Sequence, residues 1–203
     1  EKDRVIPDNY NLRRAEFRRQ LGLQPEQKLL LLVGSGFRIK GVDRALQALA
    51  LLPEELRLRC VLMILGQDNN KPFVRLAQRL GINQQVHFLG GRDDAADFMF
   101  AADLLVHPAH REAAGMVLVE AIAARLPVLV TDTCGYSFHV ARSGAGTVLE
   151  SPFDVHRFAT ETTRMLTTDN RIWREAADTY LATTDIHGMA RSAVDIFEEV
   201  LTC

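Results

Sequence analysis

The chain has 203 residues, of which 47% are hydrophobic and 25% are charged, and its formal net charge is −2. This length suffices for one well-buried core, and the ordinary composition excludes a disordered or low-complexity chain. A net charge near zero provides no basic field that would recruit nucleic acid, so no nucleic-acid partner is expected. The longest apolar runs are too short to span a bilayer, and the sequence does not open with a signal peptide.

The first 25 residues are predicted to form a linker and one basic helix over 12–21, with Asn11 as the N-cap. The chain begins at Glu1 instead of a methionine, so we expect that a further segment precedes it. The helix carries four arginines, Arg13, Arg14, Arg18 and Arg19. They have two interpretations: peripheral contact with anionic lipid at the inner face of the cytoplasmic membrane, or a solvated helix face.

From residue 26 onward, short apolar runs alternate with longer amphipathic ones, which predicts one domain over 26–203. The predicted strands are 29–33, 61–65, 86–89, 104–107, 128–131 and 147–149. The predicted helices are 42–52, 72–80, 95–101, 115–125 and 136–142, followed by 154–166, 170–181 and 189–201 with Gly188 as a break. Several strands are apolar on consecutive residues, which is typical of strands covered on both faces. Strand–helix–strand units at this spacing predict an α/β, Rossmann-like, doubly wound parallel sheet of about six strands with extra C-terminal helices.

In such a sheet, ligands bind beyond the carboxyl ends of the strands, so the loops that follow each strand are the candidate sites. The first of these loops, residues 34–41, reads Gly-Ser-Gly-Phe-Arg-Ile-Lys-Gly. Its glycines allow a close backbone approach, and Arg38 and Lys40 with the next helix N-terminus favour an anion. The loop matches neither a Walker A motif nor a dinucleotide fingerprint. A tight turn with solvated charges is the alternative interpretation.

The loop after the fourth strand carries two acids, Glu112 and Glu120, with Gly115 between them. Glu120 falls within an otherwise apolar helix, where an ionised carboxylate is costly unless it is paired or hydrogen-bonded. It could pair with an arginine, or it could accept two hydrogen bonds from a vicinal diol such as a ribose. Glu112 could accept from another polyhydroxyl group, and the amides near Gly115 could bind a phosphate between the two acids.

These residues resemble the E-x7-E motif of the retaining GT-B glycosyltransferases. The segments around residues 86–92, Ala102-Asp103, Pro108, residues 126–128 and Gly135 follow the same family pattern in the same order, as does Lys40-Gly41. Within the family, the Ala-Ala-Gly before Met116 and the segments at 34–37 and 40–44 resemble one branch, the lipopolysaccharide inner-core glucosyltransferases that add glucose to heptose. The resemblance implies that residues 26–203 are the nucleotide-sugar-binding, C-terminal half of a two-domain enzyme whose N-terminal acceptor domain is absent from this chain.

The resemblance also implies a role for each matching residue. Lys40 is expected on the donor pyrophosphate, Arg92 at the base, Glu112 on the hexose hydroxyls and Glu120 on the ribose. Glu112 and Lys40 are the expected catalytic residues. The expected donor-binding residues are Gly36, Arg38, Lys40, Arg92, Glu112, Ala114, Gly115, Met116, Val117 and Glu120. Ser35 departs from the pattern because many relatives have an arginine there, and Arg38 is the candidate replacement.

By the same resemblance, the donor is UDP-glucose, the acceptor is a lipid-linked oligosaccharide bound through the missing domain, and neither a cofactor nor a metal is required. The three cysteines, Cys60, Cys134 and Cys203, have no metal-binding spacing and fit a reduced, cytoplasmic protein. A fragment with half of the cleft is expected to bind the donor without transferring sugar.

Several other functions are compatible with parts of the sequence. His107 and His110 form the closest histidine pair and are the candidate metal ligands. Asp68, just after the second strand, could mimic the ribose-binding acid of a dehydrogenase, although the glycine fingerprint is missing. Glu112 and Glu120 could form a glycosidase pair, although one lies before the helix and the other inside it. A transferase for another UDP- or GDP-hexose and a non-catalytic nucleotide-binding module are the remaining alternatives.

Overall fold

The computed structural model describes residues 10–184, which form six strands and nine helices. The strands are β1 (Lys28–Val33), β2 (Cys60–Leu65), β3 (Val86–Gly90), β4 (Leu104–His107), β5 (Val128–Thr131) and β6 (Gly146–Leu149). The helices are α1 (Tyr10–Gln20), α2 (Val42–Ala50), α3 (Glu54–Arg57), α4 (Lys71–Arg79), α5 (Ala95–Ala101), α6 (Met116–Ala123), α7 (Ser137–Ser143), α8 (Val155–Thr167) and α9 (Arg171–Thr183).

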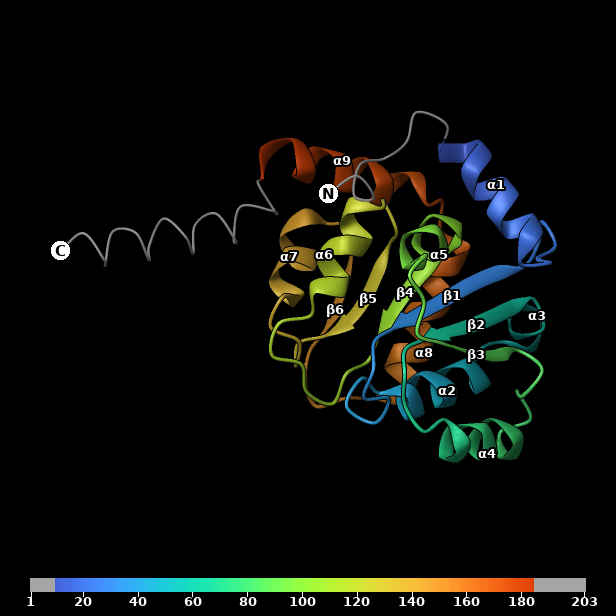
Figure 1. Ribbon diagram of the computed structural model, residues 1–203. Helices are drawn as coiled ribbons and strands as arrows, with labels where there is room; N and C mark the ends of the chain where they lie inside the picture. Colours follow the sequence, from blue (N-terminus) through green and yellow to red (C-terminus); the bar gives the residue numbers. More distant parts are fainter. Residues whose placement is uncertain (1–9, 185–203) are drawn as a thin grey trace.

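All six strands pair in parallel, in the order β3-β2-β1-β4-β5-β6 (Figure 1). The predicted doubly wound sheet is therefore confirmed, and each predicted strand begins and ends within one residue of the observed one. The short helix α3 was not predicted, since a single turn gives no measurable periodicity. The helix predicted at 189–201 lies outside the described residues.

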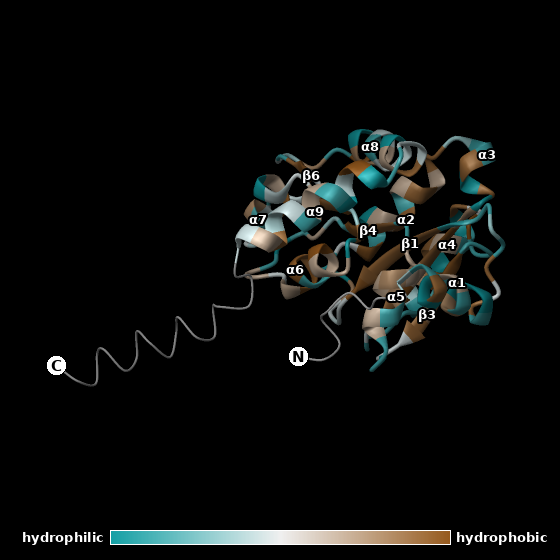
Figure 2. Ribbon diagram, turned by 90° about the horizontal axis from the view of Figure 1, so that it is seen from above, coloured by the Kyte–Doolittle hydropathy of each residue, from teal (hydrophilic) through white to brown (hydrophobic). Residues whose placement is uncertain are grey.

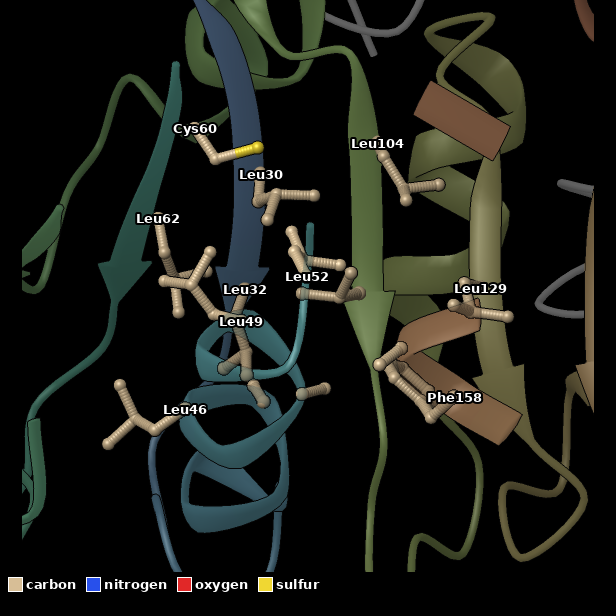
Figure 3. Packing of buried hydrophobic residues seen from close by; sticks show 14 of the residues in the cluster. Leu30, Leu32, Leu46, Leu49, Leu52, Cys60, Leu62, Leu104, Leu129 and Phe158 are labelled. Atoms are coloured by element: carbon tan, nitrogen blue, oxygen red, sulfur yellow. The ribbon is translucent and has the colours of Figure 1, made fainter. Parts of the chain in front are cut away.

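Consecutive leucines of β1 point to opposite faces of the sheet and enter two separate cores. Leu30 and Leu32 pack with α2, α4 and α8, whereas Leu29 and Leu31 pack with α1, α5, α6 and α7. Figure 3 shows the first core, in which side chains of α2 lie against β1 and Phe158 of α8 lies near Leu129 of β5. Figure 2 shows the strands mostly hydrophobic and enclosed by helices that carry hydrophilic residues. This double cover explains why the strand sequences are apolar on consecutive residues.

Helix α1 is attached to the sheet through a buried acid, Asp103, which precedes β4. Arg14 lies 2.7 Å and Arg18 3.1 Å from the carboxylate of Asp103, which also accepts a 2.7 Å hydrogen bond from the Leu29 amide. The outer two arginines are also paired, Arg13 with Asp97 and Arg19 with Glu16. Arg14 and Arg18 therefore fit neither of the two interpretations from the sequence, lipid contact or a solvated helix face. Their side chains are largely buried and connect α1 to the core.

The start of α1 differs from the prediction. Tyr10 is already helical, so Asn11 lies inside the helix and does not cap it. Among residues 10–184, no helix is long and apolar enough to cross a membrane.

Candidate functional site

The strand order reverses between β1 and β4, at the centre of the sheet. The chain leaves β1 toward β2 on one side and leaves β4 toward β5 on the other, so their carboxyl ends open a crevice. The loops that bound this crevice are residues 34–41 and residues 108–115, the two segments in which the sequence placed its candidate residues.

The two loops are held together by backbone contacts. The His110 amide donates a 2.8 Å hydrogen bond to the Ile39 carbonyl. Gly41 has a φ of 75°, and a Cβ at this position would lie 2.0 Å from the Pro108 carbonyl oxygen. Only glycine fits both the conformation and the close approach. The position of Lys40 is thus fixed relative to the loop that carries Glu112.

Two polar side chains that follow β1 and β2 stabilise the first loop. Asp68 accepts a 2.7 Å hydrogen bond from the Phe37 amide, and Ser35 Oγ accepts a 3.0 Å hydrogen bond from the Gln67 amide. Asp68 therefore supports the loop, which gives a structural role to the acid that the dehydrogenase alternative assigned to a ribose. Arg38 is exposed on the same loop and has no ion pair within residues 10–184.

The second loop is tied to the segment that follows β5. The Glu112 amide donates to the Thr133 carbonyl (3.1 Å), and the Gly135 amide donates to the Glu112 carbonyl (3.0 Å). Gly115 has a φ of 91°, and a Cβ there would lie 2.3 Å from Cys134 Sγ. The loop thus sets the direction of the Glu112 side chain and the start of α6.

Gly115 is the N-cap of α6, and no side chain caps this end. The Leu118 amide donates a 3.0 Å hydrogen bond to the Gly115 carbonyl. The amides of Met116 and Val117 lie in the first turn, where helix geometry provides no acceptor within the helix. The aligned peptides of α6 also leave a partial positive charge here. Ala114 lies directly before this end, so the predicted phosphate-binding amides of residues 114–117 are grouped at the crevice.

Lys40 and Glu112, 72 residues apart in the sequence, form an ion pair across the crevice. Their side chains are only 18% and 16% exposed. The structure thus brings together the two residues that were predicted to be catalytic. Both are already engaged with each other, so an anionic ligand that binds Lys40 must compete with Glu112.

His107, the last residue of β4, lies beneath this pair. Its side chain is fully buried, and its Nε2 is 3.8 Å from Glu112 Oε2. Burial, with the nearby charge of Lys40, lowers the pKa of His107 to about 4, so the imidazole is neutral at ordinary pH. Sequence reasoning considered His107 only as a metal ligand and missed its place beside Glu112. Its position at a strand end next to the switch point was the available signal.

The predicted histidine pair does not converge on one point. The exposed His110 lies 3.1 Å from both carboxylate oxygens of Asp43, whereas His107 is buried beside Glu112. Within residues 10–184, no group of three or more histidine, cysteine, aspartate or glutamate side chains is placed to hold a metal ion.

Glu120 lies one turn into α6 and lines a cavity of about 300 Å³ between α5 and α6. The cavity walls are Asp93, Ala95, Ala96, Met99, Phe100, Glu120, Ala123 and Ala124. Arg92 precedes this wall but binds Asp94 through two hydrogen bonds of 2.8 and 2.6 Å. The second acid of the motif therefore faces a space of its own, separate from the Lys40–Glu112 pair.

The parallel sheet, its switch point between β1 and β4 and the loops that bound the crevice there define a Rossmann-like α/β domain. The family described as group 1 glycosyl transferases matches residues 13–180. The chain belongs to this family, and the predicted membership is confirmed.

Two relatives show how much of the family's length the chain covers. The lipopolysaccharide glucosyltransferase WaaG of Escherichia coli K12 is 43% identical over 196 residues, which are 96% of this chain and 52% of that protein. A D-inositol 3-phosphate glycosyltransferase of Mycobacterium marinum is 35% identical, over 72% of this chain and 32% of that protein. The chain thus spans about half, or less, of the length of these relatives.

The solved structures agree with this assignment. A crystal structure of WaaG, described as a glycosyltransferase involved in lipopolysaccharide biosynthesis, superposes with a TM-score of 0.91 at 43% identity, covering 97% of this chain and 54% of that one. The fold is therefore one half of the GT-B fold, as the sequence predicted. Anabaena HepE in complex with UDP-glucose has the same fold, with a TM-score of 0.77 at 23% identity over 93% of this chain and 53% of that chain.

Proposed function

We propose that this chain binds a UDP-sugar, UDP-glucose, at the carboxyl ends of β1 and β4 for retaining transfer of glucose to a heptose of the lipopolysaccharide core. The observation that carries the proposal is the Lys40–Glu112 pair beside the uncapped N-terminus of α6. A cation and free amides suit a diphosphate, and a carboxylate beside them suits the hydroxyl groups of a sugar. The similarity to WaaG, a glucosyltransferase by name, supports glucose as the sugar.

The site residues divide along the length of the donor. Lys40 and the amides of residues 114–117 bind the diphosphate, with Gly36 giving the backbone room and Arg38 adding positive charge. Glu112 accepts hydrogen bonds from the hexose. Glu120 accepts from the ribose in the cavity between α5 and α6, and the segment at Arg92 lies next to the base. The order Glu112, amides, Glu120 along the chain supports this order of sugar, phosphates and ribose.

The chemistry follows from neutralising the leaving group. Departure of the sugar adds one negative charge to the diphosphate, and Lys40 with the α6 N-terminus stabilises that charge without a metal ion. In the retaining, front-face reaction of such transferases, the leaving phosphate oxygen accepts the proton of the acceptor hydroxyl, so no residue of this chain acts as a nucleophile. Glu112 is ion-paired to Lys40 and Glu120 lines a different cavity, an arrangement unlike a glycosidase pair.

The acceptor contacts belong to the N-terminal half of the whole enzyme, so this chain alone is proposed to bind the donor without transferring sugar. We place the reaction on the cytoplasmic side, where a nucleotide sugar meets a lipid-linked oligosaccharide. The helix α1 supports peripheral contact with an anionic membrane only weakly, because each of its four arginines already pairs with a carboxylate.

Replacing Lys40 by alanine tests the diphosphate part of this assignment. We expect the affinity for UDP to fall about tenfold, which is about 1.4 kcal/mol. The loss is smaller than for an unpaired cation because Lys40 gives up its ion pair with Glu112 when it binds phosphate. The affinity for uridine should change by less than about twofold on the same scale, since uridine has no phosphate. Titration calorimetry measures both.

Lys28→Ala is the matched control. Lys28 is the first residue of β1, so it lies at the opposite end of this strand from the loop that carries Lys40. This variant should bind UDP like the wild type. Loss of UDP binding in both variants, or equal loss of UDP and uridine in Lys40→Ala, would exclude a specific action of Lys40 on the diphosphate.

A further inference from the structure

His107 is a buried histidine with no hydrogen-bond partner. Its side chain is 0% exposed, and neither Nδ1 nor Nε2 makes a hydrogen bond within residues 10–184. A buried polar group without a partner costs free energy, and such groups are rare in folded proteins. An apolar residue would fill this strand end without that cost. The imidazole is therefore expected to form a hydrogen bond in another state of the site.

His107 Nε2 approaches the carboxylate of Glu112. The separation of 3.8 Å is too long for a hydrogen bond, and the pair would form one after a shift of about 1 Å. Lys40 now occupies the same oxygen, Oε2, of that carboxylate. Lys40 and His107 thus approach Glu112 as alternative donors.

Binding of the sugar donor changes the group with which Lys40 pairs. If the lysine binds the diphosphate, as the proposed function requires, Glu112 loses its cation while its side chain stays largely buried. A carboxylate in that position needs another donor, because leaving it unpaired is costly. His107 is the buried donor already beside it.

On the basis of the proposed function, we propose that His107 is a positioning residue that replaces Lys40 as the partner of Glu112 when the donor binds. The imidazole Nε2–H donates a hydrogen bond to the carboxylate and holds it toward the hexose. Lys40 is then free to neutralise the diphosphate. No bond is made or broken in this exchange beyond hydrogen bonds and the ion pair.

The charges around His107 suit a neutral donor. Burial and, to a smaller extent, the charge of Lys40 lower the pKa of His107 to about 4 against the opposing effect of Glu112, which raises it. Burial raises the pKa of the nearby Cys134 thiol to about 11, so that group adds no charge. A neutral imidazole satisfies Glu112 without placing a second cation beside it, which leaves the carboxylate a strong acceptor for sugar hydroxyls.

Removing Lys40 tests the exchange without any ligand. In full-length Lys40→Met, we expect the pKa of His107, followed by NMR of the histidine ring nitrogens, to rise by about 1 or more, as it would beside an unscreened carboxylate. A slowly exchanging Nε2–H signal should appear with it. Adding Glu112→Gln should reverse the pKa rise, and Lys28→Met should leave the spectrum of the wild type. An Nε2 that stays without its hydrogen-bonded proton in Lys40→Met would overturn the proposal.

Donor affinity tests the consequence. His107→Leu removes the donor and should weaken UDP-glucose about tenfold, whereas His107→Gln keeps an N–H donor and should stay within about threefold of the wild type. A merely structural role would lower the melting temperature without this rescue. Wild-type affinity in His107→Leu would overturn the positioning role. If the wild-type chain binds no UDP-glucose at all, the proposed function fails together with the donor-bound part of this inference, while the NMR result still decides the exchange itself.

Discussion

Replacing Asp103 by alanine is expected to lower the free energy of unfolding by about 3–5 kcal/mol, the usual cost of breaking a buried ionic group by removing one partner. The side chain of Asp103 is only 8% exposed and serves Arg14, Arg18 and the Leu29 amide at once. Alanine leaves two largely buried guanidinium groups without their acid. It also leaves the Leu29 amide at the start of β1 without its acceptor and removes the two ion pairs that tie α1 to the segment before β4.

Thermal unfolding measures this loss, with Asp97→Ala as the matched control. Asp97 also pairs with an α1 arginine, Arg13, but that arginine side chain is 43% exposed. Such an exposed pair contributes about 0–1 kcal/mol. At about 2–4 °C per kcal/mol for a chain of this size, Asp103→Ala should lower the melting temperature by about 6–20 °C and Asp97→Ala by a few degrees at most. Similar small decreases in both would mean that Asp103 does not hold α1.

The second large effect is expected on the affinity for the nucleotide. We expect Glu120→Gln to weaken UDP and UDP-glucose alike by about ten- to a hundredfold, since a carboxylate that binds two ribose hydroxyls contributes about 1.5–3 kcal/mol. Glu112→Gln should not lower the UDP affinity, because it removes the carboxylate that competes for Lys40, and it should lower the affinity for UDP-glucose. The expectation rests on the separate places of the two acids, Glu120 in the cavity beside α5 and Glu112 against Lys40.

Calorimetry on both variants with both ligands decides between the roles. Because Glu120 lies in a helix that packs into the core, a melting curve without ligand must accompany the titrations. Equal loss of UDP binding in the two variants would contradict the division between ribose and hexose. A change confined to the melting temperature would make both acids structural.

The fold was predictable because each strand is covered on both faces. The consecutive leucines of β1 mark a buried strand without any partner being known, and the glycines at 34, 36 and 41 mark its end. A four-residue helix such as α3 leaves no comparable pattern. Asn11 illustrates the limit at helix ends, because a residue that favours the N-cap is also tolerated in the first turn.

The site was predictable only to the level of its loops. The rule that ligands bind at the carboxyl ends of parallel strands brings Lys40 and Glu112 into one crevice. The same rule does not predict that Lys40 and Glu112 form an ion pair. The two residues are 72 positions apart, and their contact depends on side-chain directions that sequence spacing does not determine. The ties of Arg14 and Arg18 to Asp103 were missed for the same reason. His107 was considered only as a candidate metal ligand in an alternative that was not favoured, because residue type alone does not show that the side chain is buried beside Glu112.

The most direct test of the donor-binding site is a calorimetric titration of the wild-type chain with UDP-glucose, UDP, GDP and ADP in the presence of a chelator. We expect saturable binding of UDP-glucose and UDP, with weaker binding of GDP and ADP. Affinity should not depend on divalent metal, because Lys40 and the N-terminus of α6 supply the positive potential. Absence of UDP binding, or binding that the chelator abolishes and magnesium or manganese restores, would contradict this account of the site.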